Sequence, residues 1–574
     1  MNILLFASAY NGMCQRVHRE LEAENHRVSI ELSSNEDVMQ EAVAQFEPDL
    51  IICPFLKHRV PEAIWRKHLC LIVHPGIEGD RGPSSLDWAI DMEHPEWGVT
   101  LLQADAEMDA GDIWATSNFP LRQAAKASIY RREVISTAVA EIKRILLQAI
   151  QKPDFQPRPL DYSNPEVKGK CLPLMRQDWR KIDWFKDDTT TVAKKINAAD
   201  SFPGVLDDIA GNAVYLFGAR AEYRRTDARP GELIGYRDGA ICRATRDGSV
   251  WIRQMKLAQQ GEKTYFKLPA LQVVTQQFHN PEEFLYLKAI DSDVQQDIKT
   301  KIKNGVAYLT FDFYNGAMNT EQCLALLATL RDLRARNDIR VIALLGGEDF
   351  WSNGIHLNCI EASADPAHES WRNINAIDDV VQEILHMDNK ITVAALRNNA
   401  GAGGAIMPLA CDSVLIRDGV VLNPHYQTMG LYGSEYWTYL LPRRVGQHLA
   451  LELTNQCMPL LAKVAKSIGM VDEVLPEDWA LYHQSLQTAC EALTGDEVFF
   501  RTLEQKQQRR IADECVQPLE TYRTAELKQM KAIFDNPDSD YHKLRYNFVH
   551  KITCGKTPAR LVQHAKKEKA LQIA

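Results

Sequence analysis

The sequence lacks a Cys-x-x-Cys pair, a long hydrophobic run and an excess of basic residues. Its twelve scattered cysteines therefore predict neither a zinc ribbon nor a thioredoxin-like site, and they fit a reducing cytosol. A membrane span needs about 20 apolar residues, and the short run NILLFAS lacks the basic flank of a signal peptide. We therefore expect a cytoplasmic protein without a membrane span. The net charge of −10 disfavours nucleic acid as a partner.

The pattern along the chain predicts several domains of mixed class. Its 574 residues, 45% hydrophobic and 25% charged, are typical of a globular chain with about two to four domains. Residues 1–150 alternate short apolar runs with helical patterns, which predicts an open α/β sheet with ligands at the carboxyl ends of its strands. A proline-rich stretch at 151–170 indicates a linker. Short strands in 171–275 predict a small β-barrel, and a second α/β unit follows from about 280.

The first candidate site lies in LIVHPGIEGDRGPSSLDWAI, residues 71–90. His74 ends a β-branched apolar run and opens a loop rich in Gly and Pro. Asp109 follows in LLQADAEMDAGDIWA. A carboxylate that orients an imidazole and tunes its pKa is a recurrent catalytic device. A lone histidine is more often structural, and an Asp before Ala-Gly is often part of a turn, so the residues alone leave both interpretations open.

These stretches resemble the folate-dependent formyltransferases. RKIDW, INAADSFPG and PGELIGYRDGAICRATRDGSVWI extend the similarity to the carboxyl-terminal barrel of methionyl-tRNA formyltransferase, over about residues 1–270 in all. The resemblance implies formyl transfer from N10-formyltetrahydrofolate by an Asn–His–Asp trio, with His74 and Asp109 at two of the positions. Ile72 stands at the Asn position. Loss of one oxyanion donor costs about 2.7–4 kcal/mol of barrier. Either another donor replaces it, a role open to a protonated His74 favoured by Asp109, or the formyl acceptor differs.

The position of the loops at this edge predicts where the folate binds. Arg81 lies in the matching Arg-Gly pair after the histidine. Phe55, Leu56, Lys57 and Val60 belong to the loop that follows another predicted strand, at the edge of the sheet where His74 lies. We expect these residues to hold the folate.

The carboxyl-terminal half resembles the crotonase (enoyl-CoA hydratase) superfamily over about 280–480. The matching stretches, in order, are YNGAMNTEQ, DFWSNGIHL, NNAGAGGAIMPLACD, LNPHYQTMGLYGSEYWTYLLPRRVG and LELTNQCMPLLAKVAKSIGMVDEVLP. The resemblance implies an acyl-CoA site whose oxyanion hole is the N–H groups of Ile355 and Gly403, with Ala317, Gly354 and Gly404 beside it. We expect Gly403 to begin a helix whose dipole favours an anion. Glycine spacing alone would indicate only a tight turn.

The side chains depart from those of the hydratases. The two catalytic glutamates of enoyl-CoA hydratase map to Ile406 and His425, so enoyl hydration is not expected. Tyr426 and Glu435 form a candidate acid/base pair. Tyr436 lies beside them in the sequence. Core or dimer contacts are the alternative role for each of these aromatic residues.

The fused order of the two halves resembles the HypX/HoxX-type hydrogenase maturation family over nearly the whole chain. The resemblances assign 1–155 to a formyltransferase-like domain, 171–275 to the barrel, and 280–574 to a crotonase-like domain with carboxyl-terminal helices. They imply that formyl passes from N10-formyltetrahydrofolate to CoA, and that formyl-CoA yields carbon monoxide for NiFe hydrogenase. His74 and Asp109 would assist the transfer, and Tyr426 or Glu435 would move the proton.

Three alternatives remain open. One is a deformylase that releases formate, another is a maturation scaffold that only binds folate and CoA, and the third is a transferase whose formyl acceptor is an amine. Candidate ligands of the CoA phosphates are Lys551, Lys556 and Arg560 in the tail. Hydrogenase maturation proteins are the expected partners.

Overall fold

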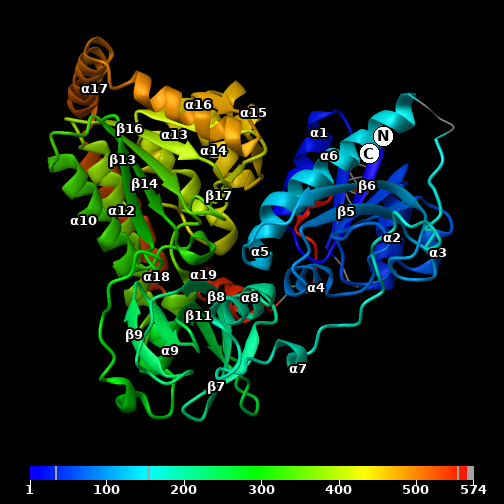
Figure 1. The fold of residues 1–574 in the computed structure, drawn as a ribbon. Helices are drawn as coiled ribbons and strands as arrows, with labels where there is room; N and C mark the ends of the chain where they lie inside the picture. The colour runs from blue at the N-terminus through cyan, green and yellow to red at the C-terminus, as the bar shows by residue number, and fades with distance from the viewer. Residues whose placement is uncertain (33–34, 152–154, 553–554, 565–574) are drawn as a thin grey trace. The chain divides into compact units, whose positions relative to one another are not determined.

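A computed structural model describes residues 1–32, 35–151, 155–552 and 555–564 (Figure 1). The chain divides into two compact units, Met1–Gln295 with Cys554–Ala574, and Gln296–Thr553. No helix among the described residues combines the length and the apolar character that a membrane crossing requires.

The first sheet carries the predicted strand–helix alternation and has the order β2-β1-β3-β4-β5-β6. Strands β1 to β4 are parallel, and β5 and β6 are antiparallel to their neighbours. The carboxyl ends of β1, β3 and β4 share one edge, where the Ser8 N–H donates to the Phe55 carbonyl at 2.7 Å. The elements are β1 (Asn2–Ala7), α1 (Gly12–Ala23), β2 (Arg27–Glu31), α2 (Glu36–Phe46), β3 (Leu50–Phe55), α3 (Glu62–Trp65), β4 (Cys70–His74), α4 (Ser85–Asp91), β5 (Glu96–Gln103), β6 (Ile113–Pro120), α5 (Lys126–Ile129), η1 (Tyr130–Val134) and α6 (Ile135–Gln151).

A second, antiparallel sheet follows residues 155–170, which contain no helix or named strand. Its order is β7-β8-β11-β10-β9, with β12 beside β11, and α8 packs against β8. The elements are α7 (Gln177–Arg180), α8 (Thr189–Ala198), β7 (Val205–Ile209), β8 (Asn212–Glu222), β9 (Leu233–Arg237), β10 (Ala240–Ala244), β11 (Ser249–Leu257), β12 (Leu268–Pro269), α9 (Ala270–Gln276) and η2 (Pro281–Phe284).

The second unit is built on a sheet of order β13-β14-β15-β16-β18-β21, parallel except for β13. A small sheet, β17-β19-β20, lies apart from it. The strands are β13 (Ile298–Lys303), β14 (Val306–Phe311), β15 (Val341–Gly346), β16 (Ile391–Leu396), β17 (Ala400–Gly401), β18 (Ser413–Arg417), β19 (Val421–Asn423), β20 (Leu460–Leu461) and β21 (Glu473–Leu475). The 3-10 turns are η3 (Tyr314–Gly316), η4 (Ala402–Ala405), η5 (Met407–Ala410) and η6 (Tyr426–Met429). The α-helices are α10 (Thr320–Ala335), α11 (Leu357–Glu361), α12 (Pro366–Leu385), α13 (Trp437–Val445), α14 (Gln447–Gln456), α15 (Ala462–Ser467), α16 (Trp479–Ala492), α17 (Asp496–Val516), α18 (Leu519–Asp535) and α19 (Asp540–His550).

The central strands of this unit are apolar along their whole length because helices cover both faces of the sheet. Successive side chains point to opposite faces, so Leu344 packs in the cluster that includes α10 and α12, and Ala343 packs in the cluster that includes α16. This burial of both faces explains why the central strands are uninterrupted runs of apolar residues in the sequence.

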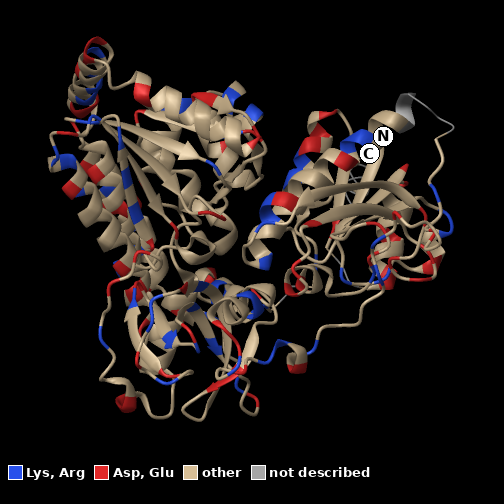
Figure 2. Ribbon diagram, in the orientation of Figure 1, with Lys and Arg blue, Asp and Glu red and all other residues tan. Residues whose placement is uncertain are grey.

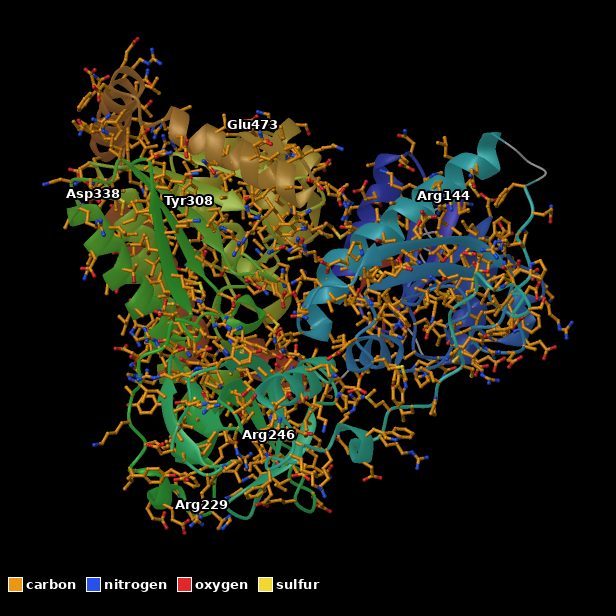
Figure 3. All side chains as sticks on the ribbon, in the orientation of Figure 1. Arg144, Arg229, Arg246, Tyr308, Asp338 and Glu473 are labelled. Atoms are coloured by element: carbon orange, nitrogen blue, oxygen red, sulfur yellow. The ribbon has the colours of Figure 1, made fainter. Side chains whose placement is uncertain are left out.

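The edge strand β13 differs from the apolar central strands because it carries lysines. Lys299, Lys301 and Lys303 alternate along it, and Lys301 is paired with Tyr308 of β14. Figure 2 shows basic and acidic residues interspersed over the helices, and Figure 3 labels Tyr308. These residues border a cavity of about 510 Å³ against α16. Lysines on an edge strand oppose pairing with another chain.

The carboxyl-terminal segment returns to the first sheet. The Ser29 hydroxyl on β2 accepts the Gln563 N–H at 2.8 Å and lies 2.7 Å from Nδ1 of His564. Thr557 accepts the Leu32 N–H at 2.8 Å. The predicted assignment of residues 280–574 to one domain is therefore wrong at its end, because these contacts place 555–564 with the first unit, on the edge strand β2.

Candidate active sites

His74 lies at the end of β4 between two carboxylates. It is buried, with 4% of its surface exposed. Its Nε2 donates to Oδ2 of Asp80 at 2.8 Å, and its Nδ1 lies 3.7 Å from Oδ1 of Asp109. The two predicted residues, His74 and Asp109, therefore face each other across the edge of the sheet, although 34 residues separate them in sequence.

The sequence did not predict a role for Asp80. Its only signal is its position six residues after the histidine, within the loop EGDRGP. Gly76 makes the contact possible, because a Cβ there would lie only 2.5 Å from Nε2 of His74 and closer still to the Asp80 carboxylate. The glycine at 76 is therefore required by the packing of the pair.

The two carboxylates set the charge of the imidazole. Burial by itself would lower the pKa of His74, but the hydrogen bond to Asp80 and the charges of Asp109 and Asp80 raise that pKa above its ordinary value. The arrangement favours an imidazolium with its Nδ1 side toward Asp109.

The remaining residues predicted at this edge have mixed surroundings. Ile72 leaves the same face of β4 as His74 and packs against an apolar cluster that contains Phe6. The Lys57 N–H donates to Ser8 at 2.9 Å, and the Lys57 ammonium lies 5.5 Å from the centre of the Phe55 ring.

Arg81 turns toward the loop that carries Asp109. It forms an ion pair with Glu107 and donates to the Met108 carbonyl at 3.3 Å. Val60 is buried and Leu56 is half-buried in the apolar cluster below the loop. The folate contacts of these residues stay predictions.

The second site is formed where two loops of the second unit meet. Ser352 is bridged to Ala400, and the Gly401 N–H donates to the Ser352 carbonyl at 2.9 Å. A Cβ on Gly354 would lie 3.3 Å from the Gly403 nitrogen, and one on Gly404 would lie 2.8 Å from Cβ of Ser352. These glycines allow two backbones to approach each other closely.

This approach brings the two predicted N–H donors together. Among the hydrogen bonds recorded for the described residues, none is donated by the N–H of Ile355 or of Gly403. Ala317, half-buried, precedes Met318, whose N–H donates to the Gly354 carbonyl at 2.9 Å. The predicted helix after Gly403 is instead two short 3-10 turns, η4 and η5, so a long helix dipole does not contribute here.

Glu435 presents its carboxyl group to Gly403. A Cβ on that glycine would lie 2.7 Å from Oε2 of Glu435, and Oε1 is closer still. Glu435 is 3% exposed, and its backbone is left-handed at φ +60°. Burial, together with the charges of Asp378 and Glu526, raises the pKa of Glu435 well above its ordinary value. This packing therefore favours the neutral, protonated form of the carboxyl group.

Tyr426 lies near the same group. It is buried, its ring is packed against Gly433, and burial together with the charge of Glu435 raises its pKa well above the ordinary value. His425 Nδ1 lies 2.7 Å from the Asn423 carbonyl and 3.4 Å from the Ala402 nitrogen, which fixes the imidazole beside η4.

Other residues singled out by the sequence are structural. Ile406 is fully buried in the core. Tyr436 is also buried there, and like Glu435 it has a left-handed backbone. His356 caps α11 by accepting the Cys359 N–H at 3.2 Å, and burial lowers its pKa to about 4.

The three tail cations are distributed over both units. Lys551 is exposed at the end of α19, 4.4 Å from the centre of the Phe548 ring. Lys556 and Arg560 belong to the segment that lies on the first sheet, Arg560 in η7 (Ala559–Leu561). A role for these cations at CoA phosphates stays a prediction.

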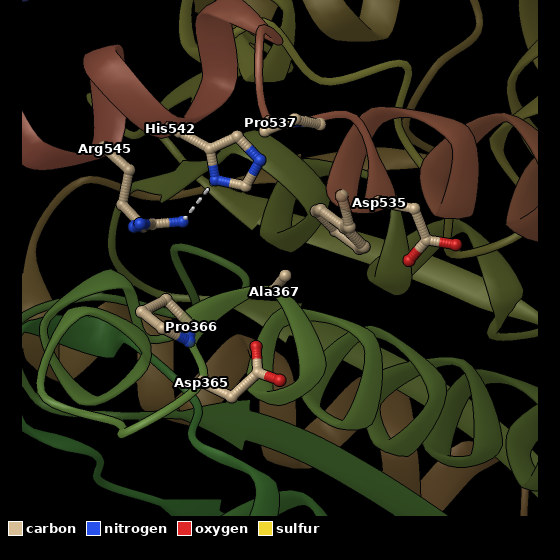
Figure 4. A pocket seen from close by; sticks show the side chains of 8 residues that line it. Asp365, Pro366, Ala367, Asp535, Pro537, His542 and Arg545 are labelled. Carbon is tan, nitrogen blue, oxygen red and sulfur yellow. Dashed lines mark hydrogen bonds between the residues drawn. The ribbon is translucent and has the colours of Figure 1, made fainter.

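A surface cavity of about 530 Å³ lies near the start of α12 (Figure 4). In it Arg545 donates to Nδ1 of His542 at 3.2 Å and to Glu361 at 2.7 Å. Its lining contains none of the predicted site residues. It is lined by Asp365, Pro366, Ala367, Phe534, Asp535, Pro537, His542 and Arg545.

These features define a two-part protein with a formyltransferase-like half and a crotonase-like half. The family model "Formyl transferase, C-terminal domain" matches residues 174–265, and "Enoyl-CoA hydratase/isomerase" matches residues 301–553. A methionyl-tRNA formyltransferase of Desulfotalea psychrophila is 26% identical over 37% of this chain and 62% of its own.

Two relatives span nearly the whole chain. The hydrogenase maturation factor HoxX of Bradyrhizobium diazoefficiens is 45% identical over 98% of this chain and 97% of its own. The crystal structure of HypX from Aquifex aeolicus in complex with tetrahydrofolic acid superposes with a TM-score of 0.92 and 41% identity over 98% of each chain. The chain belongs to the HoxX/HypX family of hydrogenase maturation factors.

Proposed function

We propose that the chain transfers a formyl group from N10-formyltetrahydrofolate to the thiol of CoA, and then releases carbon monoxide from the formyl-CoA formed. The observation that carries this proposal is the buried Glu435 carboxyl against Gly403, where burial and neighbouring carboxyl groups raise its pKa well above the ordinary value. A carboxyl group held there would act as a proton donor beside the proposed oxyanion hole. Folate as the first substrate is supported by the tetrahydrofolic acid in the related HypX structure.

The transfer step assigns roles to the residues around His74. The C–N10 bond breaks as the C–S bond forms, and the thiol proton ends on N10. The His74 imidazolium donates to the formyl oxygen, in place of the amide that formyltransferases carry at the position of Ile72. Asp109 accepts the thiol proton, because a thiolate is the attacking form of sulfur.

The release step takes place at the second site. The N–H groups of Ile355 and Gly403 bind the formyl oxygen of the thioester. Glu435 donates its proton to sulfur as the C–S bond breaks, and it then takes the formyl hydrogen as a proton, which leaves carbon monoxide. The net change is one proton moved from carbon to sulfur. Tyr426 is the second candidate for this proton transfer. Use of the carbon monoxide as an iron ligand of NiFe hydrogenase fits the family of hydrogenase maturation factors.

The proposal is tested by supplying formyl-labelled N10-formyltetrahydrofolate with CoA and measuring carbon monoxide, formate and formyl-CoA. We expect His74→Ala to abolish carbon monoxide from the folate but not from added formyl-CoA. If the wild type turns over the folate and forms neither carbon monoxide nor formyl-CoA, the proposal is wrong. Formate alone would identify a deformylase, a formylated amine would identify another transferase, and binding without turnover would identify a scaffold.

A further inference from the structure

The carboxyl group of Glu435 is one of three that lie buried together in the second unit. Asp378 of α12 and Glu526 of α18 are both fully buried. The chemistry proposed above uses Glu435 alone. We propose that Asp378 is a positioning residue that seats the Glu435 carboxyl against Gly403 through its charge and its hydrogen bonds. This inference rests on the proposed release of carbon monoxide from formyl-CoA.

Asp378 accepts hydrogen bonds from the segment that carries Glu435. The Glu435 N–H donates to Oδ1 of Asp378 at 2.8 Å, and the Ser434 hydroxyl lies 2.7 Å from both carboxylate oxygens. Glu435 and the next residue, Tyr436, both have left-handed backbones at φ +60°. A left-handed residue with a Cβ is strained and persists only where its surroundings stabilise it. The hydrogen bonds to Asp378 stabilise this left-handed backbone.

The donors around Asp378 also decide which carboxyl group carries the charge. Burial raises the pKa of Asp378 to about 6, and the donors Ser434 and Glu435 N–H, with the charge of Arg523, limit that rise. Burial and the charge of Asp378 raise the pKa of Glu526 to about 8. Of the three carboxyl groups, Asp378 is therefore the one whose charged form these donors favour most.

A charge on Asp378 keeps the proton on Glu435, because like charges in one buried cluster oppose each other. The other charged or titratable groups that interact with the cluster are Arg523, which forms an ion pair with Asp379 at 2.5 Å, and the side chains of Cys323, Tyr426, Tyr432 and Tyr436. The charge of Asp378 thereby favours the protonated form of Glu435, which is the form that can donate a proton.

The test is Asp378→Asn in the full-length protein, with formyl-CoA as substrate and carbon monoxide trapped on reduced myoglobin. The shape of the side chain is kept and its charge is removed. We expect kcat to fall about 100-fold, as for a misplaced group, with KM nearly unchanged. The alkaline limb of the kcat–pH profile should move down by about one unit as Glu435 loses its proton more easily.

Glu383→Gln is the matched control. Glu383 is another buried carboxylate of α12, but it pairs with Arg331 and Arg334. Its variant should keep the wild-type rate and profile. An unshifted alkaline limb in Asp378→Asn, with or without a loss of rate, would overturn the inference. Should that variant not fold, Asp378→Ser also removes the charge while keeping a hydrogen-bonding side chain, and it must shift the limb in the same direction.

A separate readout distinguishes failure of this inference from failure of the proposed function. The infrared band of the protonated Glu435 carboxyl is identified by its loss in Glu435→Gln. Its titration must move to lower pH in Asp378→Asn even if the wild type releases no carbon monoxide. A band that titrates identically in both proteins refutes the link between Asp378 and Glu435.

Discussion

Gly403→Ala tests the geometry of the second site with a single methyl group. The new Cβ would overlap the Glu435 carboxyl, which must retreat by about 1.5 Å to reach an ordinary contact. Glu435 has little room to do so, because it is 3% exposed and its N–H is held by Asp378. We expect about a 100-fold loss of carbon monoxide release from formyl-CoA, as for a 1 Å misplacement, and about 1–3 kcal/mol lower stability from overpacking.

Carbon monoxide release and thermal unfolding measure the two effects. Gly495→Ala is the control, since Gly495 lies in the same unit and a Cβ there meets nothing within 4 Å. Consumption of N10-formyltetrahydrofolate should be unchanged in Gly403→Ala, because His74 lies in the other unit. Wild-type release of carbon monoxide from Gly403→Ala would refute the placement of Glu435 at the oxyanion hole.

Two further predictions concern protonation. Asp80→Asn should lower the pKa of His74 and move the alkaline limb of the pH profile of formyl transfer to lower pH. Carbon monoxide release from added formyl-CoA should be unchanged. An unshifted limb would exclude a charged His74 from the transfer. The pKa of Glu526 is raised to about 8, so the folded state holds a proton that the unfolded chain releases. The free energy of unfolding therefore falls by about 1.4 kcal/mol per pH unit as pH rises toward 8. Thermal melts at pH 6 and pH 8 should show a smaller drop for Glu526→Gln, and equal drops in both proteins would contradict this.

The fold class follows from local patterns because burial on both faces produces long apolar strands. The strand–helix alternation of 1–150 and of the region after 280 appears as two mainly parallel sheets. The end of the chain could not be assigned in the same way. His564 binds Ser29 through side-chain contacts across more than 500 residues, and no local period records such a contact.

The candidate sites show the same division. The predicted partners His74 and Asp109 are within 3.7 Å of each other, and the loops of Ile355 and Gly403 meet. Asp80 was missed, because an Asp in a Gly/Pro-rich loop has no distinguishing pattern. Asp378 and Glu526 were missed because they lie within ordinary amphipathic helices, α12 and α18.

The sequence by itself determined the architecture, the oxyanion loops and the residues that could handle protons, because these depend on residue type, order and spacing. Only the tertiary structure decided their charge states. The pKa of His74 or Glu435 depends on which carboxyl groups, donors and apolar atoms surround it, and those come from distant parts of the chain. The raised pKa of Glu435 beside Gly403 is a property of packing between α12, α18 and two loops.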